Sequence, residues 1–231
     1  MSRFGTVLLD LDGTIVDAFT TIHRAYCHTL PQFGRPEPTV DAVRRAVGGG
    51  LEHAMSHFLP PEAIADACRI HLAYTDQILL EDVRLMPGTL ELLRAFHEGT
   101  RSRSPDGSAR VAGAVQFAVF TNKRGHHARL ICDHLGVSPY LAGVFGARDT
   151  PWVKPQPEFA QHALTTLGAR PETTLLIGDS PFDVKAAHAG GFACWCVTTG
   201  THSAEQLRTA GAEGVYPDLH AVRAALEDGP A

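Results

Sequence analysis

The sequence predicts an α/β fold, in which a doubly wound, Rossmann-like parallel sheet carries an inserted helical domain. Two observations predict it. Short apolar runs alternate with segments of helical periodicity from about residue 86 onward, and one such run also stands at residues 6–10. Between about residues 17 and 85 this alternation stops, and only helical patterns remain.

Six apolar runs are expected to form the sheet. They lie at residues 6–10, 115–121, 143–147, 173–179, 193–199 and 214–217. Strands that helices cover on both faces are apolar throughout, because neither face meets water. The helices that supply this cover are expected at about 88–98, 124–135, 157–167, 182–189, 203–210 and 218–227.

The inserted segment carries four helical patterns, separated by stretches rich in proline and glycine. These patterns cover about residues 18–33, 40–47, 50–58 and 61–80. We therefore expect residues 1–16 and 86–231 to form a catalytic core and residues 17–85 a helical cap domain.

Residues 98–114 form a second irregular stretch, rich in Gly, Ser and Arg. It is much longer than the usual connection of about 2–6 residues between a helix and the next strand. We expect a solvated, mobile loop there, and a contact for a partner or a second subunit is the alternative.

Composition limits the classes of function. A chain of 231 residues with 44% hydrophobic residues can bury a full core, and its net charge of -5 offers no field for binding a polyanion. We expect no nucleic-acid partner. No stretch approaches the roughly 18 apolar residues of a membrane span, and the first residues lack the apolar run of a signal peptide. A cytoplasmic protein with no membrane partner is expected.

The five cysteines are odd in number and scattered, which favours reduced thiols. Cys194 and Cys196 are two residues apart on an expected strand, so both side chains lie on one face. We expect them to serve packing, and a metal or redox pair is the less favoured alternative.

Polar side chains follow the expected strands at the edge where parallel sheets bind ligands, near the reversal of strand order. In chain order they are Asp10, Asp12, Thr121, Asn122, Lys154, Asp179 and Asp183. Each of these residue types is common on a protein surface. Their shared position at strand ends predicts that they converge on one site.

Several acids at one end of a sheet repel one another unless a cation lies between them. Because the donors are all oxygen atoms, Mg²⁺ is the favoured ion. We expect Asp10 and Asp179 to bind it through their carboxylates and Asp12 through its backbone carbonyl. Asp183 is expected to bind directly or through water, and an ordinary acid at a helix start is the alternative.

The same residues can perform phosphoryl transfer. Asp10 beside a metal can attack phosphorus and form an acyl phosphate, while Asp12 gives and takes the proton. Thr121 and Asn122 are expected to bind the phosphoryl oxygens. Lys154 is expected to neutralise the nucleophile and the phosphate.

These residues resemble the four motifs of the haloacid dehalogenase-like superfamily of aspartyl phosphohydrolases. In order, the motifs are Asp10-x-Asp12-Gly-Thr, Thr121-Asn122, Lys154 and Gly178-Asp179-Ser180-x-x-Asp183. The resemblance reaches about residue 200, and stretches such as FTNKRGHHARLICDHLGV are most similar to phosphoglycolate phosphatases. It implies Mg²⁺, a phosphoaspartyl intermediate and a cap that closes over a small phosphorylated metabolite. We expect a monomer or a homodimer.

Two other functions stay open. A sugar phosphomutase of the β-phosphoglucomutase type uses the same phosphoaspartate, but such mutases usually carry serine where Thr121 stands. A catalytically silent binding or regulatory module would lack the nucleophile or the metal-binding acids, and all are present here. Dehalogenation at carbon is disfavoured because those enzymes lack the acid at position 12.

The expected cap also offers candidates for substrate specificity. Arg44 and Arg45 precede the glycine loop that contains Gly49. A guanidinium group can bind a substrate carboxylate with two hydrogen bonds, as phosphoglycolate would require. A solvated helix end is the alternative for both arginines.

Overall fold

The computed structural model describes residues 3–97, 101–103, 109–111 and 115–228. Within them, one six-stranded parallel sheet has the order β10-β9-β8-β1-β6-β7. Its strands are β1 (Thr6–Leu9), β6 (Gln116–Arg124), β7 (Leu141–Ala147), β8 (Thr174–Gly178), β9 (Ala193–Val197) and β10 (Gly214–Tyr216). The sheet grows from β1 to one side through β6 and β7, and to the other through β8. This confirms the doubly wound prediction.

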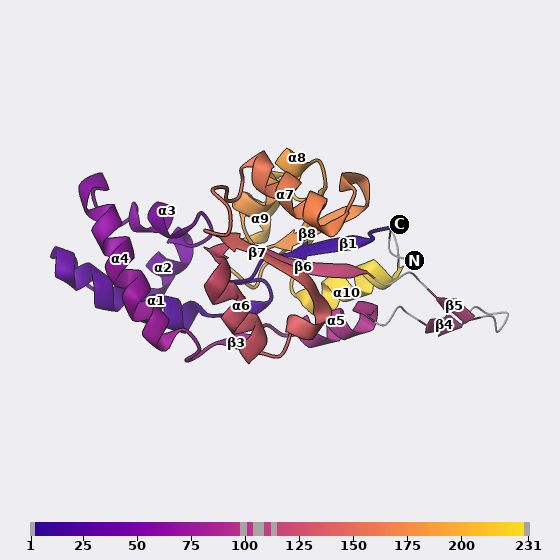
Figure 1. Ribbon diagram of the computed structural model, residues 1–231, viewed down its shortest axis with the longest axis horizontal. Coiled ribbons are helices and arrows are strands. Elements are labelled where there is room, and N and C mark those ends of the chain that lie inside the picture. Colours follow the sequence, from indigo (N-terminus) through magenta and orange to yellow (C-terminus); the bar gives the residue numbers. More distant parts are fainter. Residues whose placement is uncertain (1–2, 98–100, 104–108, 112–114, 229–231) are drawn as a thin grey trace.

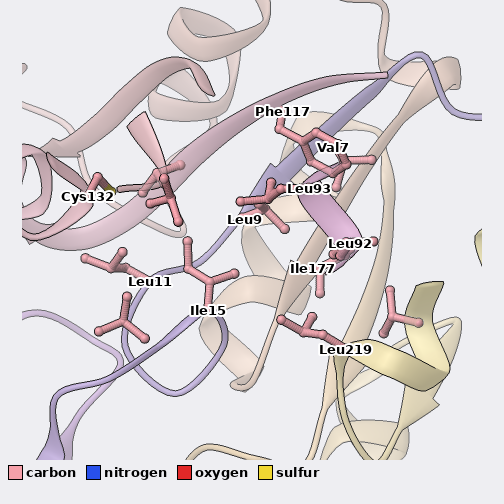
Figure 2. Close-up of a cluster of buried hydrophobic side chains, with 14 of the residues drawn as sticks. Val7, Leu9, Leu11, Ile15, Leu92, Leu93, Phe117, Cys132, Ile177 and Leu219 are labelled. Carbon is pink, nitrogen blue, oxygen red and sulfur yellow. The ribbon is translucent and has the colours of Figure 1, made fainter. Parts of the chain in front are cut away.

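Helices cover both faces of the sheet (Figure 1). One face packs against α5 (Thr89–His97), α6 (Gly125–His134) and α10 (Leu219–Asp228), and the other against α7 (Pro157–Leu167), α8 (Pro181–Gly190) and α9 (Ala204–Ala210). Figure 2 shows the first of these two cores, where Leu9 and Phe117 from the sheet face Leu92 and Leu219 from the helices.

The continuous apolar runs of the sequence follow from this double cover. Successive side chains of a strand point to opposite faces, so Val7 and Leu9 belong to one core and Leu8 to the other. All three are fully buried. A strand in this position has no face on which a polar residue would meet water.

A helical cluster lies at one end of the sheet (Figure 1). It comprises α1 (Phe19–Thr29), α2 (Val40–Ala46), α3 (Leu51–Met55) and α4 (Pro61–Ile78), with a 3₁₀ turn at Leu30–Phe33. These helices bury a core of their own around Tyr26, Val43 and Met55. The chain enters and leaves this helical cluster through a short antiparallel pair of strands, β2 (Val16–Asp17) and β3 (Arg84–Leu85).

The expected loop at residues 98–114 is corrected in part. Strands β4 (Arg101–Arg103) and β5 (Ala109–Val111) pair in antiparallel register within it. Strands of this length are too short to give a periodic signal in the sequence. The rest of that expectation, at 98–100, 104–108 and 112–114, lies outside the described residues.

The five cysteines are free, as expected. Cys194 and Cys196 are buried on the same face of β9, and their Sγ atoms lie 3.8 Å apart. Both belong to the core under α7, α8 and α9, which confirms a packing role. Among the helices that the structure describes, none combines the length and the apolar character that a membrane span requires.

The central strand gives the first prediction. Leu9→Ala should lower the free energy of unfolding by about 2–5 kcal/mol, because it leaves a cavity in a fully buried part of the core. Chemical denaturation measures this loss. Leu130→Ala is the matched control, since Leu130 is 38% exposed and should cost less than about 0.5 kcal/mol. Equal losses in the two variants would contradict the assignment of β1 to the core.

Candidate active site

Three buried carboxylates meet where β1 and β8 end. Asp10 follows β1 directly, Asp179 follows β8, and Asp183 lies in the first turn of α8. The two strands are neighbours in the sheet, with Leu9 opposite Ile177. One carboxylate oxygen from each acid lies within 4.8 Å of those of the other two, and all three residues are buried. The strand ends therefore converge as the sequence predicts.

The start of α8 fixes Asp183. Ser180 precedes the helix and Pro181 occupies its first position, where a missing N–H is harmless. Oδ2 of Asp183 accepts hydrogen bonds from the backbone N–H groups of Asp179 and Ser180 and from the Ser180 hydroxyl. Asp183 therefore caps its helix, and at the same time it faces the other acids.

Lys154 lies between two of the acids. Its Nζ atom is 2.6 Å from Oδ1 of Asp183 and 2.9 Å from Oδ1 of Asp10, and its side chain is 1% exposed. Burial lowers the pKa of Lys154, but the charges of Asp10 and Asp183 outweigh burial and raise the pKa above its ordinary value. The two carboxylates therefore favour the protonated form of the side chain.

Asp179 is hydrogen-bonded to the loop that contains Thr201, which no sequence motif marked as part of the site. One carboxylate oxygen, Oδ2, accepts hydrogen bonds from the backbone N–H and the hydroxyl of Thr201, at 2.9 and 3.1 Å. Glycine is required around it: a Cβ at Gly200 would lie 1.9 Å from the same oxygen. At Gly13, where φ is +86°, a Cβ would lie 2.9 Å from it. A close approach of two backbone segments leaves no pattern in the sequence.

The charges of this cluster do not balance. Three carboxyl groups face one ammonium group, so two negative charges would remain without a partner if all three were ionised. Burial, and next the charges of neighbouring acids, raise the pKa of Asp179; burial also raises the pKa of Asp10, against the effect of Lys154. Raised carboxyl pKa values indicate that the cluster lacks positive charge.

A divalent cation fits this site. Among the described residues, Lys154 is the one group paired with the buried Oδ1 of Asp10, at 2.9 Å. The donor set consists of oxygen atoms alone, which suits Mg²⁺. The residues present thus supply both the charge and the ligand type that the ion needs.

Asp12 lies beside the cluster and has a partner of its own. Nζ of Lys123 donates to both its carboxylate oxygens, at 2.9 and 3.1 Å, and the two side chains are 12–13% exposed. Lys123 is a site residue that sequence reasoning did not single out. Its position directly after Thr121 and Asn122, at the end of β6, was the available signal.

Thr121 and Asn122 differ in how far their side-chain atoms are already used in hydrogen bonds. The Thr121 hydroxyl is buried and accepts a hydrogen bond from the N–H of Lys123. Both functional atoms of the Asn122 side chain are occupied: Oδ1 accepts from the N–H of Lys154, and Nδ2 donates to the carbonyls of Lys154 and Gly48. Asn122 therefore positions Lys154 and contacts the cap loop.

A cavity of about 140 Å³ opens over the acids and reaches into the helical cluster. Its lining residues include Asp10, Asp12 and Asp179 from the acidic region and residues of α1, α4 and α6. Arg44, Arg45 and Gly49 are not among its lining residues. The Arg44 guanidinium lies over the Phe19 ring, 4.4 Å from its centre, and Arg45 is exposed.

Gly49 serves the packing of the cap loop. A Cβ there would lie 2.5 Å from the His53 ring and 2.7 Å from the Phe182 ring. The loop can approach α8 this closely only because Gly49 has no side chain. A part in substrate specificity for Gly49, Arg44 or Arg45 stays a prediction.

Comparisons with known proteins identify the family. A family model for haloacid dehalogenase-like hydrolases matches residues 4–191. The chain belongs to this family. It is an enzyme of the hydrolase class, and the resemblance expected from its motifs is confirmed.

Individual relatives and solved structures resemble this hydrolase at modest sequence identity. It is 31% identical over 210 residues to "Probable phosphatase IndB" of Dickeya dadantii, covering 88% of this chain and 85% of that protein. It is 28% identical over 204 residues to "Phosphoglycolate phosphatase 1" of Pseudomonas aeruginosa, covering 84% and 69%. A crystal structure described as a predicted phosphatase from Clostridium acetobutylicum has the same fold, with a TM-score of 0.85 at 19% identity, covering 97% and 99%.

The charge imbalance predicts how this hydrolase responds to Mg²⁺. At about a hundred times the Kd, Mg²⁺ should raise the free energy of unfolding of the wild type by about 2.7 kcal/mol, since it binds only the folded site. Asp179→Asn should lose most of this gain because it removes one ligand charge. Thermal unfolding with and without the ion measures both.

Asp66→Asn is the matched control, because Asp66 is exposed on α4 and lies outside the cluster. This variant should keep the full gain in the free energy of unfolding when Mg²⁺ is added. A wild type that Mg²⁺ does not stabilise, or an Asp179→Asn variant that it stabilises equally, would contradict the metal assignment.

Proposed function

We propose that this hydrolase cleaves phosphomonoesters through a covalent phosphoaspartyl intermediate on Asp10. The observation that carries the proposal is the buried cluster, in which Asp10 lies 2.9 Å from Nζ of Lys154 and beside two further acids. A carboxylate at such a site can attack phosphorus, because the surrounding positive charge offsets the charge of the incoming phosphate.

In the first step, an oxygen of Asp10 forms a bond to phosphorus while the bond from phosphorus to the ester oxygen breaks. Asp12 gives its proton to that oxygen, which leaves as an alcohol. In the second step, Asp12 takes a proton from water, and the water oxygen attacks phosphorus. The acyl phosphate bond breaks, inorganic phosphate leaves and Asp10 is restored.

The neighbouring residues support these steps by their contacts. Lys154 would neutralise Asp10 and a phosphoryl oxygen, and the Thr121 hydroxyl can donate to another. Lys123 holds both oxygens of Asp12 and thereby fixes its orientation. Asn122 acts through Lys154, whose backbone it holds on both sides.

We also propose that Mg²⁺ is the cofactor. Asp10 and Asp179 would hold it through their carboxylates, Asp12 through its backbone carbonyl, and Asp183 directly or through water. When bound, the ion supplies the missing positive charge and polarises the phosphoryl group. Its donor set is one that Mg²⁺ prefers.

Residues 17–85 are proposed as a cap domain over this site. Their separate hydrophobic core and the cavity that they share with the acids support this role. Asn122 contacts Gly48, and His127 of α6 bonds to Asp76 of α4 at 2.6 Å. A substrate enclosed there is a small phosphorylated metabolite, and we propose a phosphoglycolate phosphatase-like activity because several relatives carry that name. A cytoplasmic location and a monomeric or homodimeric state stay predictions.

Phosphate release from a panel of phosphomonoesters, including phosphoglycolate and sugar phosphates, tests the function. The wild type should release phosphate with Mg²⁺ and not with chelator. Asp10→Asn should reduce turnover to below about a thousandth of the wild-type value, because it removes the proposed nucleophile. Its thermal unfolding should show that the fold persists. Substantial turnover by purified Asp10→Asn would overturn the nucleophile assignment, and no release from any ester by the wild type would favour the mutase or a silent module.

Asp12→Asn separates the two steps. With p-nitrophenyl phosphate, whose leaving group needs no proton, the variant should give a burst of p-nitrophenolate and then turn over about 10²–10⁴-fold more slowly than the wild type. Rapid-mixing absorbance measures both phases. Unchanged steady-state turnover would remove Asp12 as the acid and base.

A further inference from the structure

The loop between β9 and α9 places two half-buried side chains, Thr201 and His202, next to the acidic cluster. Thr201 lines the same cavity as Asp179. It donates to Oδ2 of that carboxylate from its backbone N–H and from its hydroxyl, at 2.9 and 3.1 Å. Neither Thr201 nor His202 takes part in the proposed phosphoryl transfer, so their contacts with Asp179 need a reason of their own.

This loop is itself anchored on both sides. The Thr199 hydroxyl donates to the carbonyl of Gly13 at 2.7 Å, and the backbone N–H of Thr198 donates to the carbonyl of Tyr216 in β10 at 3.0 Å. These bonds join the loop to the segment after β1 and to the neighbouring strand. Thr201 therefore approaches Asp179 from a fixed direction.

The hydrogen bonds to Asp179 use its two carboxylate oxygens unequally. Each oxygen of an ionised carboxylate can accept about two hydrogen bonds. Oδ2 receives two, both from Thr201, whereas Oδ1 receives one among the described residues, from the Thr14 hydroxyl at 3.3 Å. The lone pair that is left for a cation is therefore on Oδ1.

His202 determines where the single proton of the Thr201 hydroxyl points. Its Nδ1 atom lies 2.6 Å from Oγ1 of Thr201, which also contacts Oδ2 of Asp179. The carboxylate oxygen can only accept, so the hydroxyl proton must point to it for that bond to form. Both contacts are then satisfied only if Nδ1 carries a proton and donates to the hydroxyl oxygen.

We propose that Thr201 and His202 are positioning residues for the cation site. Nδ1 of His202 donates to the Thr201 hydroxyl, the hydroxyl donates to Oδ2 of Asp179, and the carboxylate is thereby held with Oδ1 available to Mg²⁺. This inference rests on the proposed cofactor and adds two residues that determine how tightly the site binds it. Hydrogen-bond partners of metal ligands commonly have this effect, because they fix the orientation of the ligand.

Calorimetric titration of the metal-free protein with Mg²⁺ tests the part of Thr201. Thr201→Val keeps the shape and the backbone N–H but removes the hydroxyl, and it should raise the Kd for Mg²⁺ at least about tenfold. Thr201→Ser keeps the hydroxyl and should stay within about threefold of the wild type. Thr198→Val is the matched control from the same loop, since the Thr198 hydroxyl donates to the carbonyl of Pro217, and its Kd should be unchanged.

The part of His202 has a test of its own, in which Thr201 stays in place. His202→Phe keeps a ring but removes the Nδ1 donor, and it should raise the Kd for Mg²⁺ at least about threefold. His202→Asn offers a side-chain N–H near the position of Nδ1 and should keep most of the affinity. Because His202 acts through the hydroxyl, the double variant Thr201→Val/His202→Phe should bind Mg²⁺ no more weakly than Thr201→Val alone.

A Thr201→Val variant that binds Mg²⁺ as tightly as the wild type would overturn the proposal. This holds even if the variant unfolds at a lower temperature in chelator, because the role of Thr201 would then be structural alone. Losses that add in the double variant would overturn the part assigned to His202. A wild type that shows neither binding of Mg²⁺ by calorimetry nor a shift in thermal unfolding would instead overturn the proposed cofactor, and this inference with it.

Discussion

The ion pairs of Lys154 with Asp10 and Asp183 are the interaction on which the rest of this site depends. Three buried carboxylates without this lysine would each carry a large desolvation penalty. With it, two negative charges would still remain if all three acids were ionised, and the pKa values of Asp10 and Asp179 stay raised. This shortage of positive charge is the basis on which we propose a divalent cation at the site.

The fold brings the charged residues of this cluster together from separate parts of the chain. Pairing of β1 with β8 brings Asp10 next to Asp179, and the first turn of α8 adds Asp183. Lys154 comes from the connection after β7, and the Asn122 side chain fixes its backbone. The helical cluster adds mostly apolar side chains to the lining of the cavity, and Glu52 is the one lining carboxylate among its described residues.

Much of this was predictable from the sequence because it depends on local patterns. Apolar runs and helical periodicity indicated the parallel sheet and its helices, and polar residues after the strands indicated the acids and Lys154. The contacts that tune the site were not predictable in this way. Thr201 and Gly200 act on Asp179 from a loop distant in the chain, and the Asn122 amide holds Lys154 although its motif indicated phosphate.

The most direct test of the account is to find the phosphoryl group on the enzyme. Wild type and Asp12→Asn, mixed with p-nitrophenyl phosphate and Mg²⁺ and quenched in acid within the burst, would be digested and analysed by peptide mass spectrometry. The account predicts one phosphoryl group on the peptide that contains Asp10, at higher occupancy in Asp12→Asn, and none in Asp10→Asn. Turnover without any phosphorylated peptide, or a phosphoryl group on another residue, would contradict it.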